Sequence, residues 1–164
     1  MAIAPLPAGL NLRPQRDNDA AFLAALYRTL RDDLRMLEAE HAFVEELIEM
    51  QFRAQREGYG QQFPNAMYFI IELQREAVGR VAVDFGHNEV RVIDLALLPA
   101  ARNRGHGGHV IRALQLAAAQ TRAPLTLVAA LNNPRALRFY ATLDFTVAQT
   151  TDSHALLIWY PEQT

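Results

Sequence analysis

Three β-rich segments follow one another between residues 66 and 98, and only short polar turns separate them. Each segment is rich in β-branched and aromatic residues, as strands usually are. Gly86, His87 and Asn88 fit a tight hairpin turn, and Pro99 ends the third segment. Turns this short join antiparallel strands, so we expect an antiparallel sheet at the centre of the fold. The predicted strands are AMYFIIEL (66–73), AVGRVAVDF (77–85) and EVRVIDLALL (89–98).

Helical periodicity precedes and follows these strands. A short strand is predicted over 10–14, and Asp17 or Asp19 is placed to cap a helix whose apolar face ends at Leu30. A second helix is predicted over 36–57, before the glycine- and proline-containing segment 58–65. Residues 1–9 are expected to form a flexible tail. The elements predicted after Pro99 are a helix to about Ala118, a strand (124–131), a helix (133–143) and a closing hairpin (145–149 and 154–160).

The element order is therefore β-αα-βββ-α-β-α-ββ. It predicts one domain over residues 1–164, of the α/β (α+β) class, in which helices flank a mixed, mostly antiparallel sheet. No repeat and no long linker divides the chain.

Composition argues against several classes of protein. The net charge is −2, which disfavours a nucleic-acid-binding surface. The chain has no cysteine, so it has no disulfide, no thiolate metal site and no cysteine nucleophile. No apolar run approaches the ~18 residues of a membrane span, and the first residues lack the basic and apolar regions of a secretion signal. We therefore expect a cytoplasmic protein that binds neither nucleic acid nor membrane.

A glycine-rich, cationic turn follows the third strand, within LLPAARNRGHGGHVIRAL (97–114). A strand that leads through such a turn into a helix leaves several backbone N–H groups unpaired at one point. These groups and the helix dipole attract anions, and glycine lets the backbone approach a ligand closely. The segment therefore suits a pyrophosphate. Its glycines are Gly105, Gly107 and Gly108, and its basic residues are Arg102, Arg104, His106, His109 and Arg112.

Two well-known phosphate-binding patterns do not fit this turn. The Walker loop needs Gly-Lys-Ser/Thr, which is absent. The dinucleotide fingerprint needs a third glycine, where Val110 stands, and an acidic residue about 20 positions further on, near Leu125. A third pattern fits: Arg102-x-x-Gly105-x-Gly107 resembles the R/Q-x-x-G-x-G/A signature of the GNAT family, the Gcn5-related N-acetyltransferases.

A second motif extends this resemblance. The segment NPRALRFYATLDF (133–145) is similar to the family's N-x-x-A-x-x-x-Y-x-x-L-G-F. Asp144 stands where the family often has glycine, and aspartate tolerates the left-handed conformation of a turn after a helix. The matching residues are Asn133, Ala136, Tyr140, Leu143 and Phe145.

The resemblance implies a GNAT-like fold and the direct transfer of an acetyl group from acetyl-CoA, the cosubstrate, to an amine. It also implies that the strands before and between the two motifs splay apart around the thioester. We expect no metal, because His106 and His109 have no third ligand in view. The residues implied to bind acetyl-CoA are Leu95, Ala96, Leu97, Arg102, Asn103, Arg104, Gly105, His106, Gly107, Gly108, Asn133, Ala136 and Tyr140.

The family's usual general acid is a tyrosine at the position of Tyr140. A tyrosine at its ordinary pKa gives its proton to a thiolate at a cost of about 2 kcal/mol. Some members place a glutamate base where this chain has Val128. Asp94 is the predicted base, Asp84 is the other nearby carboxylate, and an amine that arrives already deprotonated is a further alternative.

The acceptor site is predicted on the second helix. Gln51, Gln55 and Tyr59 continue the stripe begun by Val44 and Ile48, which places them to bind an amine of a small molecule or a protein. Three alternatives stay open: a noncatalytic acyl-CoA-binding or regulatory module of the same fold, a different donor such as succinyl-CoA, and assembly as a homodimer.

Overall fold

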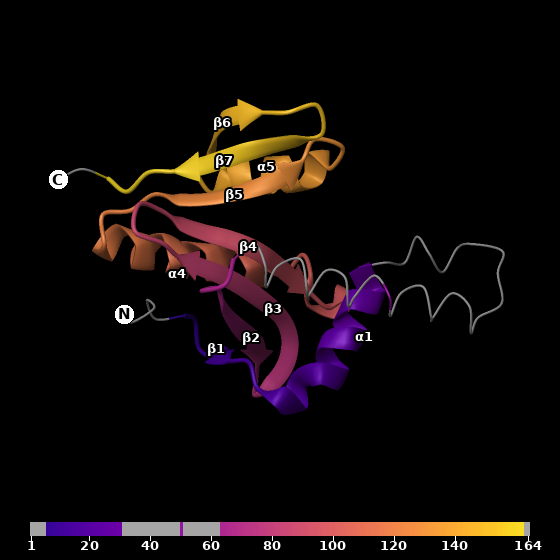
Figure 1. Ribbon diagram of the computed structural model, residues 1–164. Helices are drawn as coiled ribbons and strands as arrows, with labels where there is room; N and C mark the ends of the chain where they lie inside the picture. The colour runs from indigo at the N-terminus through magenta and orange to yellow at the C-terminus, as the bar shows by residue number, and fades with distance from the viewer. Residues whose placement is uncertain (1–5, 31–49, 51–62, 163–164) are drawn as a thin grey trace, which may run out of the picture.

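The fold is a seven-stranded sheet with helices on both faces (Figure 1). The computed structural model describes residues 6–30, 50 and 63–162. The strand order is β1-β2-β3-β4-β5-β7-β6; β4 and β5 run parallel, and the other neighbours are antiparallel. This confirms the predicted mixed, mostly antiparallel sheet. The strands are β1 (Leu10–Pro14), β2 (Met67–Leu73), β3 (Glu76–Phe85), β4 (Val90–Leu97), β5 (Leu125–Ala130), β6 (Thr146–Thr150) and β7 (His154–Trp159).

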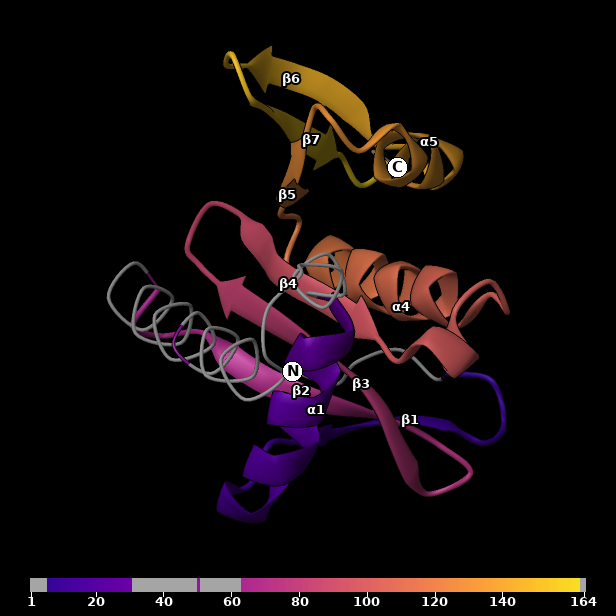
Figure 2. The ribbon, with the colours of Figure 1, turned by 90° about the vertical axis from the view of Figure 1, so that its right-hand side faces the viewer.

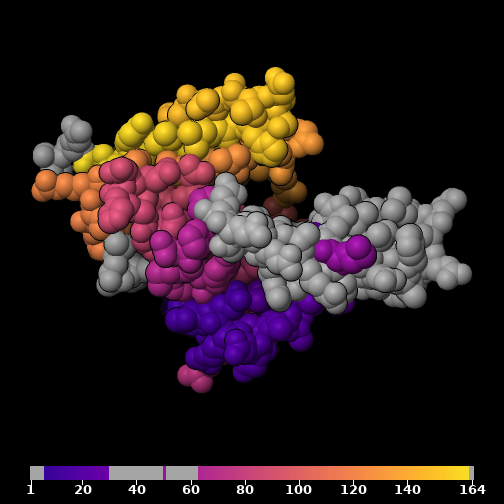
Figure 3. All heavy atoms as spheres, viewed as in Figure 1, coloured from indigo at the N-terminus to yellow at the C-terminus, as the bar shows by residue number. Residues whose placement is uncertain are grey.

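The helices are α1 (Ala20–Leu30), α4 (His106–Gln120) and α5 (Pro134–Thr142), with short 3-10 turns η1 (Asp17–Asp19) and η2 (Pro99–Ala101). Figure 2 shows α1 on one side of the sheet and α4 on the other. A small core joins Leu23 and Tyr27 of α1 to Ile70 of β2. The main core lies under α4 and α5 and includes Ile111, Leu114 and, after α5, Phe145. In the space-filling view, the C-terminal strands lie above β2 and β3, and α1 lies below them (Figure 3).

The predicted elements that fall within the described residues lie close to the observed ones. The three central strands, the helix after the glycine-rich turn and the closing hairpin are confirmed, whereas the two 3-10 turns were not predicted. Of the second predicted helix (36–57), the structure describes Met50, which is helical. Residues 6–9 of the expected tail contact the domain: Leu6 packs against the main core, and the carbonyl of Gly9 accepts from the N–H of Gln74 at 2.8 Å.

Within the part of the chain that the structure describes, none of the helices is both long enough and apolar enough to cross a bilayer.

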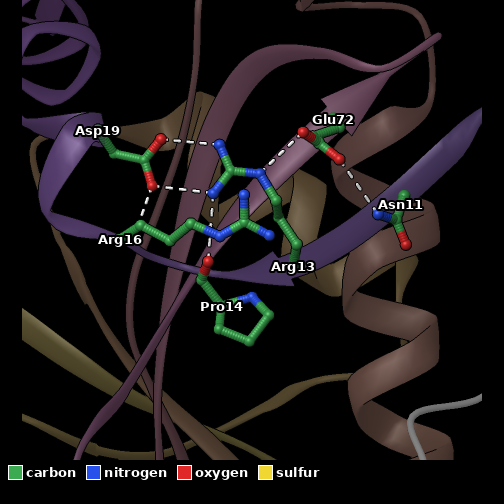
Figure 4. Close-up of polar contacts among 6 residues, drawn as sticks. All are labelled: Asn11, Arg13, Pro14, Arg16, Asp19 and Glu72. Atoms are coloured by element: carbon green, nitrogen blue, oxygen red, sulfur yellow. Dashed lines mark hydrogen bonds and ion pairs between the residues drawn. The ribbon is translucent and has the colours of Figure 1, made fainter.

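A network around Arg13 joins the first strand to the start of α1 (Figure 4). The Arg13 guanidinium donates to both carboxylate oxygens of Asp19, at 2.7 and 2.9 Å, and its Nε donates to Glu72 on β2 at 2.8 Å. Asp19 also accepts from the N–H of Arg16 at 2.7 Å, which caps the first turn. The hydrogen bond from Arg13, helped by that of Arg16, lowers the pKa of Asp19 to about 2. Arg16 is therefore the N-cap, and Asp19 is the third residue of the turn, so the prediction that Asp17 or Asp19 occupies the capping position is wrong.

Replacing Asp19 by asparagine should lower the free energy of unfolding by about 2 kcal/mol at neutral pH, because charge-assisted hydrogen bonds are lost. The folded pKa lies below the ordinary value of 3.8, so the stabilisation is complete above about pH 4 and fades as the pH falls toward 2. Urea unfolding as a function of pH measures this. Asp17→Asn, at an exposed neighbouring carboxylate, is the control and should change little. A difference between parent and Asp19→Asn that persists undiminished at pH 2 would contradict the assignment.

Candidate active site

β4 and β5 separate part-way along their length, and β5 rises away from β4 (Figure 2). Their pairing ends at Val92 and Leu127, whereas β4 stays paired with β3 and β5 with β7. The space between them is a cavity of about 250 Å³, here called the gap. Its lining residues are Val92, Ile93, Asp94, Leu95, Leu127, Val128, Ala129, Ala130, Asn133, Ala136 and Tyr140.

A β-bulge marks the point where the two strands part. Val92 pairs with Val83 and Asp94 pairs with Ala82, so Ile93 is an extra residue on β4. A bulge bends its strand and increases the local twist. Because Ile93 directly follows the last residue paired with β5, the bulge helps to turn β4 away and brings Asp94 to the wall of the gap.

A second cavity, of about 440 Å³, runs from the gap to the start of α4 and is here called the groove. The two cavities share Leu95, Ala136 and Tyr140. The groove is therefore built from the free edge of β4, the glycine-rich turn and one side of α5. Its lining residues are Leu95, Ala96, Leu97, Arg102, Asn103, Gly105, His106, Gly107, Gly108, Ala136, Phe139 and Tyr140.

The start of α4 lies at the far end of this groove. Gly105 precedes the helix with φ of 86°, a left-handed conformation that favours glycine, and it has no side chain to cap the helix. Among the described residues, no hydrogen bond uses the N–H groups of His106, Gly107 or Gly108. The groove therefore ends at unpaired N–H groups on the positive end of a helix dipole.

Arg102 adds a second unpaired donor. Its Nε donates to the carbonyl of Leu97 at 2.9 Å, which ties the turn back to the end of β4. Its Nη2 is buried and has no hydrogen-bond partner among the described residues. A buried donor of a charged group is costly to leave unpaired, so this nitrogen is suited to an anionic ligand in the groove.

Gly107 and Phe139 face each other in the groove. A Cβ built on Gly107 would lie 3.6 Å from the Phe139 ring, 3.8 Å from Leu97 and 3.9 Å from Leu95. These are ordinary contact distances, and all three neighbours line the groove. The fold therefore has room for a small side chain at 107, and that side chain would occupy groove space.

Tyr140 lies where the gap and the groove meet. Its ring makes edge contacts with Phe139 and Phe145, with centroids 5.0 and 5.6 Å apart. Burial, with a smaller contribution from the negative charge of Asp94, raises the pKa of Tyr140 to about 12. Tyr140 is therefore a neutral hydrogen-bond donor throughout the physiological pH range.

Asn133 and Asp144 fix the two ends of α5. The side-chain oxygen of Asn133 accepts from the N–H of Ala136 at 3.1 Å, so Asn133 is the N-cap, and it also lines the gap. Asp144 has φ of 70°, which confirms the predicted left-handed turn, and it pairs with Arg112 of α4 at 3.2 Å. Buried Gln115 of α4 donates to the carbonyl of Leu143 at 2.8 Å. These bonds hold α5 beside the gap.

The predicted carboxylates lie in different places. Asp94 lines the gap, and one of its oxygens accepts from Arg80 of β3 at 2.5 Å. Asp84 of β3 lies opposite Arg91 of β4 in the strand register, near the end where β4 and β5 are still joined. It lines neither cavity. Val128 is half exposed at the wall of the gap, where it supplies an apolar surface.

Comparison with known proteins agrees with this architecture. A family model described as an acetyltransferase (GNAT) domain matches residues 64–147, just over half of the chain. The chain belongs to the GNAT acetyltransferase family. The match covers both cavities and both sequence motifs of this GNAT domain, and it confirms the family predicted from them.

Solved structures of acetyltransferases have a similar fold over more than nine tenths of this chain. A PaiA N-acetyltransferase from Thermoplasma acidophilum, in complex with coenzyme A, has a TM-score of 0.69 at 14% identity, covering 92% of this chain and 98% of its own. An acetyltransferase from Thermus thermophilus has a TM-score of 0.68 at 17% identity, covering 95% and 99%. Naa50 from Arabidopsis thaliana, in complex with the bisubstrate analogue CoA-Ac-MVNAL, has a TM-score of 0.64 at 14% identity, covering 93% and 99%. No curated protein sequence gives a significant match.

The structure brings most of the residues predicted to bind acetyl-CoA together around the groove. Arg104 is an exception, being exposed and lining neither cavity, and Asn133 lies in the gap. The predicted acceptor residues Gln51, Gln55 and Tyr59 lie outside the described residues. Phe139 also lines the groove but was not among the predicted residues, although it is an aromatic residue beside the motif tyrosine. No group of three or more side chains suited to a metal ion occurs in the described part of the chain.

Proposed function

We propose that this GNAT domain is an N-acetyltransferase that moves the acetyl group of acetyl-CoA directly to a primary amine. The observation that carries the proposal is the groove, which runs from unpaired N–H groups at the start of α4 to a neutral tyrosine at the gap. This order matches the ligand, in which a pyrophosphate lies at one end of an extended arm and a thioester at the other.

The pyrophosphate end is supported by three features of this chain. The N–H groups of residues 106–108 have no partner in the described chain, the buried Nη2 of Arg102 has none, and Gly107 leaves the wall of the groove open. The buried Arg102 nitrogen is costly to leave unpaired, and free N–H groups at the start of a helix attract an anion. Residues Arg102 to Gly108 would therefore hold the phosphates.

The arm would follow the free edge of β4. Beyond Val92 this edge has no strand partner on the side of β5, and the Leu97 carbonyl accepts from Arg102, so the backbone of residues 95 and 96 is left for an extended amide chain. Phe139 on α5 would cover the arm from the other side. Bound acetyl-CoA would supply a thioester, and the described residues would hold it at the junction of groove and gap.

Tyr140 would donate a hydrogen bond to the sulfur as the thiolate leaves. With its pKa raised to about 12, complete proton transfer to a thiolate of ordinary basicity would cost about 5 kcal/mol, against about 2 kcal/mol for an ordinary tyrosine. Hydrogen bonding and positioning by Tyr140 would therefore contribute more than a completed proton transfer before the bond breaks.

Direct transfer to the amine, without an acyl-enzyme, is supported by the cysteine and serine content of the chain. The chain has no cysteine, and its single serine, Ser153, lies exposed in the turn between β6 and β7, where it bonds to His154. Asp94 as general base stays a prediction. One of its oxygens already accepts a hydrogen bond from Arg80, at 2.5 Å.

The alternative of a noncatalytic acyl-CoA-binding module has less support. Such a module needs the groove alone, whereas this chain also places a neutral, half-buried phenol at the edge of the gap. For the acceptor, two neighbours indicate amines to try: a spermidine N-acetyltransferase SpeG chimera from Vibrio cholerae and hSSAT, and Naa50 with its MVNAL peptide analogue.

Substituting Gly107 by valine tests the pyrophosphate site. The Cβ would meet only side chains that line the groove, and the two methyl groups would fill groove space, so the protein should fold but lose at least about 100-fold in affinity for free CoA, measured by calorimetry. Leu116→Val, on the exposed face of the same helix, controls for a β-branched residue in α4 and should bind CoA like the parent. A folded Gly107→Val variant that binds CoA with the affinity of the parent would contradict the assignment of the groove as the CoA site.

Replacing Tyr140 by phenylalanine distinguishes an N-acetyltransferase from a noncatalytic acyl-CoA-binding module. Turnover at saturating substrates should fall roughly 10²–10⁴-fold while CoA affinity stays within a few-fold of the parent, as followed by CoA release with spermidine or a peptide amine. Tyr160→Phe, at an exposed tyrosine, should leave both quantities unchanged. Because the pKa of Tyr140 is about 12, its ionisation should not lower the parent's turnover below about pH 11. Equal turnover in the parent and in Tyr140→Phe would contradict a catalytic role for the Tyr140 hydroxyl and leave the ring with a packing role alone.

A further inference from the structure

Gln115 of α4 is a buried amide side chain. It is only 2% exposed and lies one helical turn after Ile111, beside the main core. Its Nε2 donates to the carbonyl of Leu143 at 2.8 Å, and its Oε1 accepts from Nη1 of Arg112 at 2.9 Å. Burying an amide is costly unless its polar atoms are hydrogen-bonded, so these two bonds offset that cost.

The Leu143 carbonyl lies at the end of α5, the helix that carries Tyr140. Leu143 is the C-cap, and its N–H donates to the carbonyl of Tyr140 at 3.0 Å. The N–H of Phe145 donates to the same carbonyl at 3.2 Å, and the rings of Tyr140 and Phe145 are in edge contact. The last carbonyls of a helix have no partner within it. The bond from Gln115 therefore supplies one of them with a partner and ties the end of α5 to α4, just after Tyr140.

Arg112 and Asp144 determine which way the Gln115 amide faces. Nη1 of Arg112 donates both to Oε1 of Gln115 at 2.9 Å and to Oδ2 of Asp144 at 3.2 Å. Since the amide oxygen is held toward Arg112, the amide NH2 group is turned toward the Leu143 carbonyl. Asp144 directly follows Leu143 in the chain. Arg112, Gln115, Leu143 and Asp144 thus form a closed set of contacts around the end of α5, here called the α5 clamp.

The backbone at Asp144 favours glycine. Its φ is 70°, which glycine adopts without strain and aspartate only at some cost. This is also the position where the second sequence motif has glycine. The carboxylate of Asp144 is paired with Arg112 at 3.2 Å. The α5 clamp therefore accounts for an aspartate at this turn, because glycine would leave Arg112 without that carboxylate.

We propose that Gln115, oriented by Arg112 and Asp144, is a positioning residue that sets the place of the Tyr140 hydroxyl. This rests on the proposed function, in which that hydroxyl donates to the leaving sulfur. Such catalysis depends on accurate placement, because an error of about 1 Å at a reacting centre can lower a rate by about 100-fold. The start of α4 carries the N–H groups proposed for the pyrophosphate, so Gln115 joins the helix at one end of bound acetyl-CoA to the helix at the other.

Replacing Gln115 by methionine removes both bonds and keeps an unbranched side chain of similar length. Turnover at saturating substrates should fall at least about 10-fold, while CoA affinity and the acceptor KM stay within about 3-fold of the parent, because the change acts on Tyr140. CoA release measures this, with whichever of spermidine and the peptide MVNAL the parent acetylates faster. In a Tyr140→Phe background the same replacement should lower turnover less than about 2-fold, since no hydroxyl is left to position.

Asp144→Gly separates positioning from stability. Glycine relieves the backbone at this position, so the midpoint of urea unfolding should stay close to that of the parent. Turnover should nevertheless drop about 3-fold, because Arg112 loses the carboxylate that helps to orient Gln115. Crystal structures of the parent and of Gln115→Met give a readout that needs no turnover: the Tyr140 hydroxyl should move by at least about 0.5 Å relative to β4 in the variant.

Thr126→Val is the matched control for the loss of a buried polar group. Thr126 on β5 is equally buried, at 2% exposed, and its hydroxyl bonds to Arg91 and Glu89 at 2.7 and 2.6 Å. It lies where β4 and β5 are still joined. Thr126→Val should therefore lower the midpoint of urea unfolding and leave turnover unchanged.

Three results overturn the positioning role while the proposed function stands: parent turnover in folded Gln115→Met, an equal loss in the Tyr140→Phe background, or a hydroxyl that stays in place. A parent that binds CoA but acetylates neither amine contradicts the proposed function, and the two crystal structures then decide whether Gln115 sets the place of the hydroxyl. If Gln115→Met does not fold, the turnover of Asp144→Gly decides the question, and turnover equal to that of the parent overturns the proposal.

Discussion

The end of pairing between β4 and β5 is the constraint on which the rest of the site depends. A parallel pair inside a sheet normally continues to the strand ends, yet here it stops at Val92 and Leu127 while each strand keeps its outer neighbour. The sheet therefore stays continuous at one end and opens at the other. Because the edge of β4 is left without a strand, a ligand with amide groups can take the place of one.

Beside the open end of the sheet, hydrogen bonds and an ion pair join α4, α5 and the glycine-rich turn. Buried Gln115 links α4 to the end of α5, Arg112 pairs with Asp144, and Arg135 of α5 bonds to Asn103 of the glycine-rich turn. These bonds link α4, the glycine-rich turn and α5 to one another beside the gap. Among the described residues, the two ends of the resulting channel differ in charge: donors without a partner lie near the start of α4, and one carboxylate, Asp94, lines the gap.

Much of this architecture could be predicted from the sequence because it depends on local patterns. Strand boundaries followed β-branched runs, and the turn at Asp144 followed from its place after a helix. The site beyond the motifs could not be predicted in the same way. The bulge at Ile93 depends on register with β3, the free Nη2 of Arg102 depends on how the turn folds back to Leu97, and the raised pKa of Tyr140 depends on burial by distant segments. Arg80 gave no signal, since an arginine in a strand is usually exposed on one face.

The central claim is that the groove and the gap together hold acetyl-CoA, with the phosphates at α4 and the sulfur at Tyr140. A crystal structure of the protein with CoA tests this most directly. The predicted result has the pyrophosphate within hydrogen-bond distance of the N–H groups of residues 106–108 and of Arg102 Nη2, and the sulfur beside the Tyr140 hydroxyl between β4 and β5. CoA bound on the face that α1 covers, or a sulfur placed away from Tyr140, would contradict the account.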